Sequence, residues 1–120
     1  MDKLTISTII TTCNRPVDIL ERAVRSVAMQ KRLPEELIII DDSSAGGKHT
    51  EEITKMLSKY AGKIDLHYLK NEGSKGACYS RNRGVEAATG DYIAFLDDDD
   101  EWSPLKLLIQ EKKALEDESA

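Results

Sequence analysis

Four consecutive aspartates, at positions 97–100, directly follow the apolar segment 92–96. Like charges this close repel one another and cost stability unless a cation binds. Mg²⁺ and Mn²⁺ prefer carboxylate oxygens, and a metal held by one or two carboxylates keeps positions open for phosphate oxygens. Because alternate residues of an extended segment point the same way, Asp97 and Asp99 can share one ligand while Asp98 points elsewhere. The run predicts a metal and phosphate site; the alternative is a solvated loop that favours the next helix N-terminus.

A second acidic pair, Asp41 and Asp42, ends the apolar run 37–40. One of its carboxylates could accept a hydrogen bond from a sugar hydroxyl or from a base N–H. The alternative is a turn or helix cap, because Asp42 with Ser43 and Ser44 is good turn chemistry. The pair alone does not separate these two interpretations.

Two familiar phosphate-binding motifs are absent. The dinucleotide fingerprint needs a glycine-rich turn after the first strand, whereas residues 11–15 (TTCNR) hold no glycine. The Walker pattern fails because Asp42 stands where its first glycine belongs and His49 where its Ser or Thr belongs. The loop 73–76 (GSKG) is a generic glycine-rich turn that could still present backbone N–H groups to an anion.

The elements that carry these residues alternate between strand and helix patterns. Strands are expected at residues 4–10, 37–40, 64–69 and 92–96, and each is followed by apolar residues at helical spacing. Ser103 and Pro104 predict the N-cap and first turn of the last helix. Such alternation predicts an α/β fold, a Rossmann-like and mostly parallel sheet of about four strands with helices on both faces. The loops after Ile10, Ile40 and Leu96 should then face one crevice.

Composition fits a single domain over residues 1–120 with 40% apolar residues. The net charge of −5 argues against nucleic acid as a partner. No signal-peptide pattern or membrane-length apolar segment is present, and two cysteines do not make a disulfide framework, so a cytoplasmic location is expected.

His49 and His67 have no second metal ligand at sequence spacing and are expected to be structural or solvated. Four cations are expected at the surface, namely Arg15, Lys48, Lys75 and Arg83.

Five segments occur in a characteristic order: residues 7–15 (STIITTCNR), 37–44 (LIIIDDSS), 71–77 (NEGSKGA), 80–84 (SRNRG) and 90–100 (GDYIAFLDDDD). In this order and spacing they resemble the family-2 glycosyltransferases of the GT-A fold. The resemblance covers nearly the whole chain. Each segment alone is a weak signal, and their combination is a strong one.

The resemblance implies a nucleotide-diphosphate-sugar donor, most often a uridine one, and a divalent cation, Mg²⁺ or Mn²⁺. It implies that residues 97–99 are an Asp-x-Asp motif in which Asp99, with Asp97, binds the metal. The implied nucleotide-binding residues are Thr11, Thr12, Cys13, Asn14, Asp42, Arg81, Asp97 and Asp98. It further implies inverting transfer to a saccharide or other hydroxyl acceptor, with the metal acting on the departing diphosphate and a carboxylate base on the acceptor.

Two departures from the family pattern matter. Cys13 stands where the family often has an aromatic residue, which leaves the identity of the base open. Only 20 residues follow Asp100 and they read as one helix, so no catalytic base is identified and truncation before the acceptor region is expected. The sheet surface left uncovered in this way is expected to favour self-association.

Two other functions remain as alternatives. The first is a module that binds a nucleotide sugar without transferring it. The second is a phospho-receiver signalling domain, which has a similar length and an acidic pair after an apolar strand. The position of the pair after the second strand, and the short chain after Asp97, count against the receiver.

Overall fold

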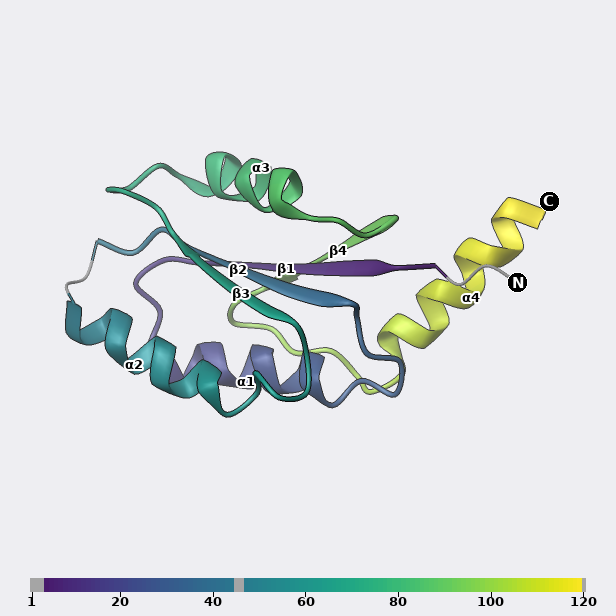
Figure 1. The fold of residues 1–120 in the computed structure, drawn as a ribbon, viewed down its shortest axis with the longest axis horizontal. Helices are drawn as coiled ribbons and strands as arrows, with labels where there is room; N and C mark the ends of the chain where they lie inside the picture. The colour runs from purple at the N-terminus through teal and green to yellow at the C-terminus, as the bar shows by residue number, and fades with distance from the viewer. Residues whose placement is uncertain (1–3, 45–46, 120) are drawn as a thin grey trace.

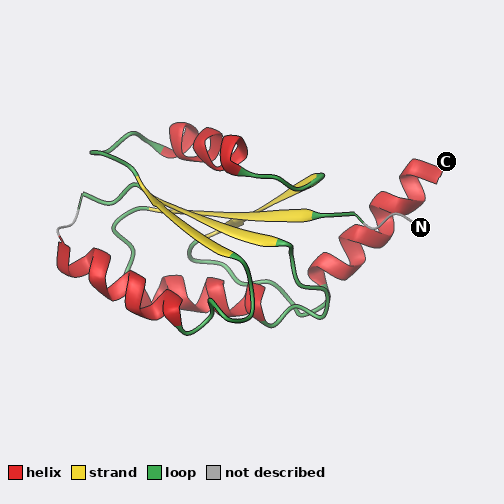
Figure 2. Cartoon of the chain, in the orientation of Figure 1, coloured by secondary structure: helices red, strands yellow, loops and turns green. Residues whose placement is uncertain are grey.

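The computed structural model describes residues 4–44 and 47–119 of the chain. Its four strands are β1 (Ile6–Thr12), β2 (Glu36–Asp41), β3 (Leu66–Lys70) and β4 (Tyr92–Asp97). They form one parallel sheet in the order β3-β2-β1-β4 (Figures 1 and 2). The predicted parallel α/β sheet of about four strands is confirmed, and all four strands therefore end at the same edge.

The helices lie on both faces of the sheet, as predicted. They are α1 (Val17–Ala28), α2 (Gly47–Ser58), α3 (Ala77–Ala87) and α4 (Lys106–Ser119). In Figure 1, α1 and α2 cover one face, α3 covers the other, and α4 extends away from the end of the sheet near the N-terminus. No helix in the part of the chain that the structure describes is long and apolar enough to cross a membrane.

The core is divided by the sheet into two unequal parts. The larger part packs Ile10 and Ile39 of the sheet against Leu20 and Val24 of α1, together with apolar residues of α2. The smaller part lies toward α3 and is built on Ile9, Ile38 and Ile40. Both faces of β2 are therefore covered, which explains why its sequence is a continuous apolar run.

Helix α3 lies unusually close to the sheet at Gly84. A Cβ atom placed on this glycine would lie 2.7 Å from Cγ2 of Ile9. A side chain at position 84 would therefore collide with the Ile9 side chain of β1 unless that side chain or the helix moved. The glycine allows α3 to lie directly against the strand whose end enters the candidate site.

Strand β4 is the less protected edge of the sheet. Phe95 is 47% exposed although it pairs in register with the fully buried Ile9, and Ile93 is 37% exposed. Helix α3 covers the centre of this face but leaves the β4 side open. The self-association expected from such a surface stays a prediction.

The last helix begins later than the sequence predicted. Ser103 and Pro104 were expected to open it, but α4 starts at Lys106. The carbonyl of Ser103 accepts a hydrogen bond from the Gln30 side chain (2.6 Å), and the carbonyl of Pro104 accepts one from the backbone N–H of Lys31 (2.8 Å). These contacts with the end of α1 hold the segment as a turn and delay the helix.

Candidate functional site

The loops that follow the strands meet in a pocket of about 240 Å³ at the carboxyl edge of the sheet. Residues from the β1, β2 and β4 loops and from the start of α3 line it. The lining residues are Thr11, Thr12, Cys13, Arg15, Asp42, Gly76, Ala77, Ser80 and Asp98. The loops after β1, β2 and β4 thus share one pocket, which is the arrangement that the parallel topology predicted.

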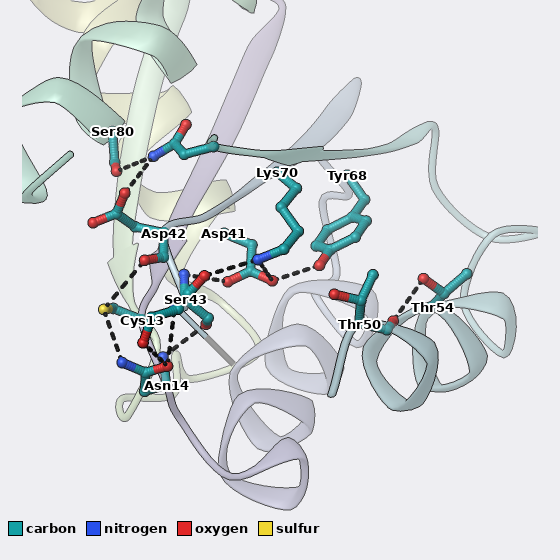
Figure 3. Close-up of polar contacts among 12 residues, drawn as sticks. Cys13, Asn14, Asp41, Asp42, Ser43, Thr50, Thr54, Tyr68, Lys70 and Ser80 are labelled. Atoms are coloured by element: carbon teal, nitrogen blue, oxygen red, sulfur yellow. Dashed lines mark hydrogen bonds and ion pairs between the residues drawn. The ribbon is translucent and has the colours of Figure 1, made fainter. Parts of the chain in front are cut away.

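Asp42 is held by donors from the loop that precedes α3. Its Oδ1 accepts hydrogen bonds from Nδ2 of Asn71 and from the backbone N–H of Lys75, both at 2.8 Å, and its Oδ2 accepts one from the backbone N–H of Gly76 at 2.9 Å. Burial disfavours the charged form, but these hydrogen bonds outweigh it and hold the pKa of Asp42 below its usual value. Asp42 is therefore a fixed carboxylate, and Figure 3 shows it beside Ser80.

Asp41 is fully buried and faces the other side of the sheet. Its Oδ1 accepts the backbone N–H of Ser43 (2.9 Å), and its Oδ2 accepts the Tyr68 hydroxyl and lies 3.8 Å from Nζ of Lys70 (Figure 3). Burial alone would raise the pKa of Asp41, but the bonds from Ser43 and Tyr68 and the charge of Lys70 lower it. Burial, together with the hydrogen bond to the Asp41 carboxylate and its negative charge, raises the pKa of Tyr68. Asp41 therefore fixes the loop that carries Asp42.

The β1 loop turns sharply at Asn14, a non-glycine residue with a φ of 53°. Its backbone N–H donates to Oγ of Ser43 (2.7 Å), and its Oδ1 accepts the backbone N–H of Ser44 (3.1 Å). Asparagine tolerates this left-handed conformation better than most residues. The turn leaves Cys13 exposed at the mouth of the pocket.

The acidic run after β4 divides into two groups. Asp98 is buried, where its carboxylate accepts a hydrogen bond from Oγ1 of Thr12 (2.8 Å) and pairs with Arg15 (3.1 Å). The other three aspartates are exposed, and they have carboxylate oxygens that all lie within 4.8 Å of one another: Asp97, Asp99 and Asp100. Three hard oxygen donors at this spacing fit a divalent cation such as Mg²⁺ or Mn²⁺, with coordination positions left for other oxygens.

The loop that carries the acidic run is also fixed from α1. Nη2 of Arg22 donates to the backbone carbonyl of Asp99 (2.7 Å), and Nη2 of Arg15 lies 3.9 Å from Oδ2 of Asp99. Arg22 of α1 thus anchors the backbone of the run, and Arg15 of the β1 loop pairs with its side chains. The exposed carboxylates are left facing away from the core.

The sequence-predicted residues are not all in one place. Thr11, Thr12, Cys13, Asp42 and Asp98 line the pocket, and Asp97 and Asp99 lie in the exposed carboxylate cluster. Asn14 supports the β1 loop through Ser43 and Ser44. Arg81 is exposed and is not among the lining residues.

Sequence reasoning did not select four of the lining residues: Arg15, Gly76, Ala77 and Ser80. A signal was present for Gly76, because the glycine-rich turn before α3 can offer backbone N–H groups. Ser80 and Ala77 share one side of the first turn of α3, so helical spacing could have identified the pair once Gly76 was placed. Arg15 was expected at the surface, whereas its guanidinium pairs with Asp98.

The family model for glycosyl transferase family 2 matches residues 7–120. A putative teichuronic acid biosynthesis glycosyltransferase, TuaG of Bacillus subtilis, is 39% identical over 99 residues, which cover 82% of this chain and 38% of that protein. A putative colanic acid biosynthesis glycosyl transferase, WcaA of Escherichia coli, is 35% identical over 73% of this chain and 30% of its own length. The chain thus spans less than two-fifths of the length of these relatives.

Solved structures agree with the sequence relatives. TarS 1-349 of S. aureus in complex with UDP-GlcNAc superposes with a TM-score of 0.76 at 25% identity, over 96% of this chain and 32% of that one. A mannosyltransferase of Pyrobaculum calidifontis, in complex with GDP-Man and Mn²⁺, has the same fold, with a TM-score of 0.76 at 16% identity over 88% of this chain and 31% of its own. The phospho-receiver alternative is wrong, and the chain belongs to glycosyl transferase family 2 with a GT-A fold.

Proposed function

We propose that this chain forms the donor-binding part of a glycosyltransferase, and that its pocket binds a nucleotide-diphosphate sugar together with a divalent cation. The observation that carries the proposal is the position of the pocket beside the exposed carboxylate cluster. One site offers polar side chains for a nucleoside, and the other offers oxygens for a metal. A diphosphate that joins the two would satisfy both.

The chain's own residues divide the work of binding. An ionised carboxylate has about four acceptor positions, and three of those on Asp42 are filled by Asn71, Lys75 and Gly76. The remaining position can accept an N–H of the base or a hydroxyl of the ribose. Thr11, Thr12, Cys13 and Asn14 form the loop that borders the same nucleoside, and Asp97 or Asp98 approaches the ribose.

The metal site consists of Asp99 and Asp97, with Asp100 at its rim. These carboxylates hold Mg²⁺ or Mn²⁺, which when bound neutralises charge on the departing diphosphate. Arg15 lies between Asp98 and Asp99 and adds positive charge on the pocket side. Arg81 does not line the pocket, but its long, exposed side chain on α3 can reach a nucleotide that is bound there.

Uridine is the proposed base. The support comes from S. aureus TarS, which has been solved with UDP and with UDP-GlcNAc. Cys13 is small, so it offers no ring for stacking on the base. Discrimination among bases would therefore rest on hydrogen bonds, with Asp42 as the principal acceptor.

Transfer itself is proposed to invert the sugar and to use a saccharide or another hydroxyl acceptor. One relative is named a GalNAc(5)-diNAcBac-PP-undecaprenol beta-1,3-glucosyltransferase, from Campylobacter jejuni; it is 34% identical over 80% of this chain and 30% of its own length. The residues described here supply the donor site, and a general base is not assigned among them. Binding of the nucleotide sugar without transfer is the second candidate function for these residues.

The experiment is calorimetric titration of UDP into the purified chain with and without Mn²⁺. We expect binding that requires the metal and that is lost in Asp99→Ala, because this variant removes a carboxylate from the cluster. Glu101→Gln is the matched control. It removes an exposed negative charge next to the run but outside the cluster, so it should bind UDP as the wild type does.

Two results would change the proposal. Metal-dependent binding of GDP, ADP or CDP in place of UDP would keep the donor site and replace the base. Failure of every nucleoside diphosphate at millimolar concentration, on a sample with a cooperative unfolding transition, would refute the donor site.

A further inference from the structure

A second group of metal-ligand side chains lies at the opposite end of the sheet from the pocket. Glu36 begins β2, and Asp65 and His67 flank the start of β3. Nε2 of His67 lies 3.1 Å from Oδ2 of Asp65 and 3.6 Å from Oε1 of Glu36. One ligand atom from each residue lies within 4.8 Å of the other two. The parallel pairing of β2 with β3 brings the three side chains together.

Glu36 differs from a surface carboxylate in how it is held. It is only 5% exposed, and its Oε2 accepts three hydrogen bonds, from Oγ of Ser7 (2.6 Å) and from the backbone N–H (2.7 Å) and Oγ1 (3.0 Å) of Thr89. Its Oε1 receives no hydrogen bond from any residue that the structure describes and lies beside His67. One oxygen of a buried carboxylate is thus fixed by the protein, while the other is left facing the cluster.

The two separations from His67 are close to those between ligand atoms around a bound zinc ion. Zinc binds imidazole nitrogen at about 2.0–2.1 Å and carboxylate oxygen at about 2.0–2.2 Å, so tetrahedral ligand atoms lie roughly 3.3–3.5 Å apart. The separations of 3.1 Å and 3.6 Å from His67 lie on either side of this value. The side chains of His67 and Asp65 are exposed, so their ligand atoms can shift by about a few tenths of an ångström to reach this separation. The Glu36 carboxylate is fixed by its hydrogen bonds.

We propose that Glu36, Asp65 and His67 form a zinc-class metal site. One imidazole with two carboxylates favours Zn²⁺ over Mg²⁺ or Ca²⁺, which prefer sites made only of oxygen. The hydrogen bonds from Ser7 and Thr89 orient the Glu36 carboxylate, as outer partners do in metal sites. Three protein ligands leave one tetrahedral position for water. Sequence spacing predicted His67 to be structural or solvated, because Glu36 lies on the neighbouring strand and is 31 residues away in sequence.

The site is independent of the proposed donor site. Its ligands lie where β2 and β3 begin, and the pocket lies where the strands end. A bound ion would link the first residues of these two strands and would raise the stability of the folded chain, since only the folded state brings the ligands together. Loss of the donor site would leave this prediction unchanged.

The test is a titration of Zn²⁺ alone into a Cys13→Ser, Cys78→Ser background, because both thiols are exposed and a free thiol is itself a ligand for zinc. Imidazole nitrogen resonances are followed by NMR, together with the thermal midpoint. We expect Zn²⁺ to shift the His67 ring resonances and to raise the midpoint. His67→Gln should weaken this binding by at least tenfold, because loss of even an outer partner weakens metal binding about 10- to 100-fold.

The matched controls are His49→Gln, which removes the other imidazole, and Asp99→Ala, which removes the acidic cluster near the pocket. Both should keep the His67 shift and the rise in midpoint. Asp65→Asn should weaken binding as His67→Gln does. If Zn²⁺ leaves the His67 resonances unchanged in the background protein, or if His67→Gln binds Zn²⁺ with unchanged affinity, the three side chains form only an ion-pair cluster and the proposal is refuted.

Discussion

Two acidic segments end two strands of the same sheet, yet their carboxylates have opposite environments. The pair Asp41 and Asp42, at the end of β2, is buried and accepts hydrogen bonds from Ser43, Tyr68, Asn71 and the loop before α3. Of the run at the end of β4, Asp97, Asp99 and Asp100 are exposed and cluster with one another. The carboxylates of the first segment are satisfied by hydrogen bonds within the protein, whereas the exposed carboxylates of the second are accessible to a ligand from solvent.

The position of each strand explains the difference. β2 is a central strand, so its end lies beneath the loops of β1 and β3, and their donors surround the carboxylates. β4 is an edge strand with a loop on one side only. Asp98 is the one member of the run that points toward β1, and it is the one that is buried and bonded to Thr12. An aspartate at this edge is therefore buried and held in place where neighbouring loops offer hydrogen-bond donors to its carboxylate, and exposed where they do not.

The largest expected effect separates the two segments by stability. Asp41→Ala removes the acceptor of the Ser43 N–H and the Tyr68 hydroxyl, and hydrogen bonds to charged groups contribute about 1.5–3 kcal/mol. We expect a loss of about 3 kcal/mol in the free energy of unfolding, measured with urea at pH 7. Asp100→Ala, at the exposed segment, should change this quantity by less than about 0.5 kcal/mol. Equal losses in the two variants would show that the segments do not differ.

If Asp41→Ala does not fold, Tyr68→Phe tests the same point more gently. It removes one donor to the Asp41 carboxylate and adds no new group. We expect it to lower the free energy of unfolding by a smaller amount than Asp41→Ala would, and by more than Asp100→Ala. A Tyr68→Phe chain as stable as the wild type would show that Asp41 does not depend on this bond.

The second effect is a pH dependence that belongs to the buried pair. The pKa of Asp42 is lowered in the folded chain, whereas an unfolded aspartate has a pKa of about 3.9. The unfolded state then binds the proton more readily, so this stabilisation is fully present above about pH 4 and is lost as the pH falls through the folded pKa. The stability advantage of the wild type over Asp42→Asn should shrink from pH 5 to pH 2.5 in urea unfolding. A difference that stays constant over this range contradicts the assignment.

The smallest effect tests the exception, Asp98. Thr12→Val keeps the shape of the side chain but removes the Oγ1 donor to a charged acceptor, so we expect a loss of about 1.5 kcal/mol in the free energy of unfolding. Thr8→Val is a close control on the same strand, because Oγ1 of Thr8 is buried and has no hydrogen-bond partner. That variant should be neutral or stabilising, since burying an unpaired hydroxyl is unfavourable. A cost at Thr8 equal to that at Thr12 would mean that the bond to Asp98 contributes nothing.

The sequence predicted what depends on local pattern and parallel topology. The apolar run that became β2, and the position of Asp42 and Asp98 at one edge, follow from strand–helix alternation alone. The partners of Asp42 do not, because they depend on a loop that reaches its conformation through positive φ angles at Gly73 (74°) and Gly76 (95°).

Long-range contacts account for the other differences. Arg83 was expected at the surface, but its Nη1 donates to the backbone carbonyl of Lys70 (2.9 Å) and to Oδ1 of Asn71 (2.8 Å). The late start of α4 likewise results from contacts with Gln30 and Lys31. No pattern within a single segment contains these pairings, because each joins elements that only the folded sheet brings together.

The close approach of α3 to the sheet at Gly84 bears on the dimensions of the pocket. Ser80 lies one helical turn before Gly84 and on the same side of the helix. The distance between helix and strand at residue 84 therefore governs how far Ser80 stands from the loops of β1 and β2. Gly84 does not line the pocket and has no side chain, yet by setting the distance between α3 and β1 it limits the width of the pocket.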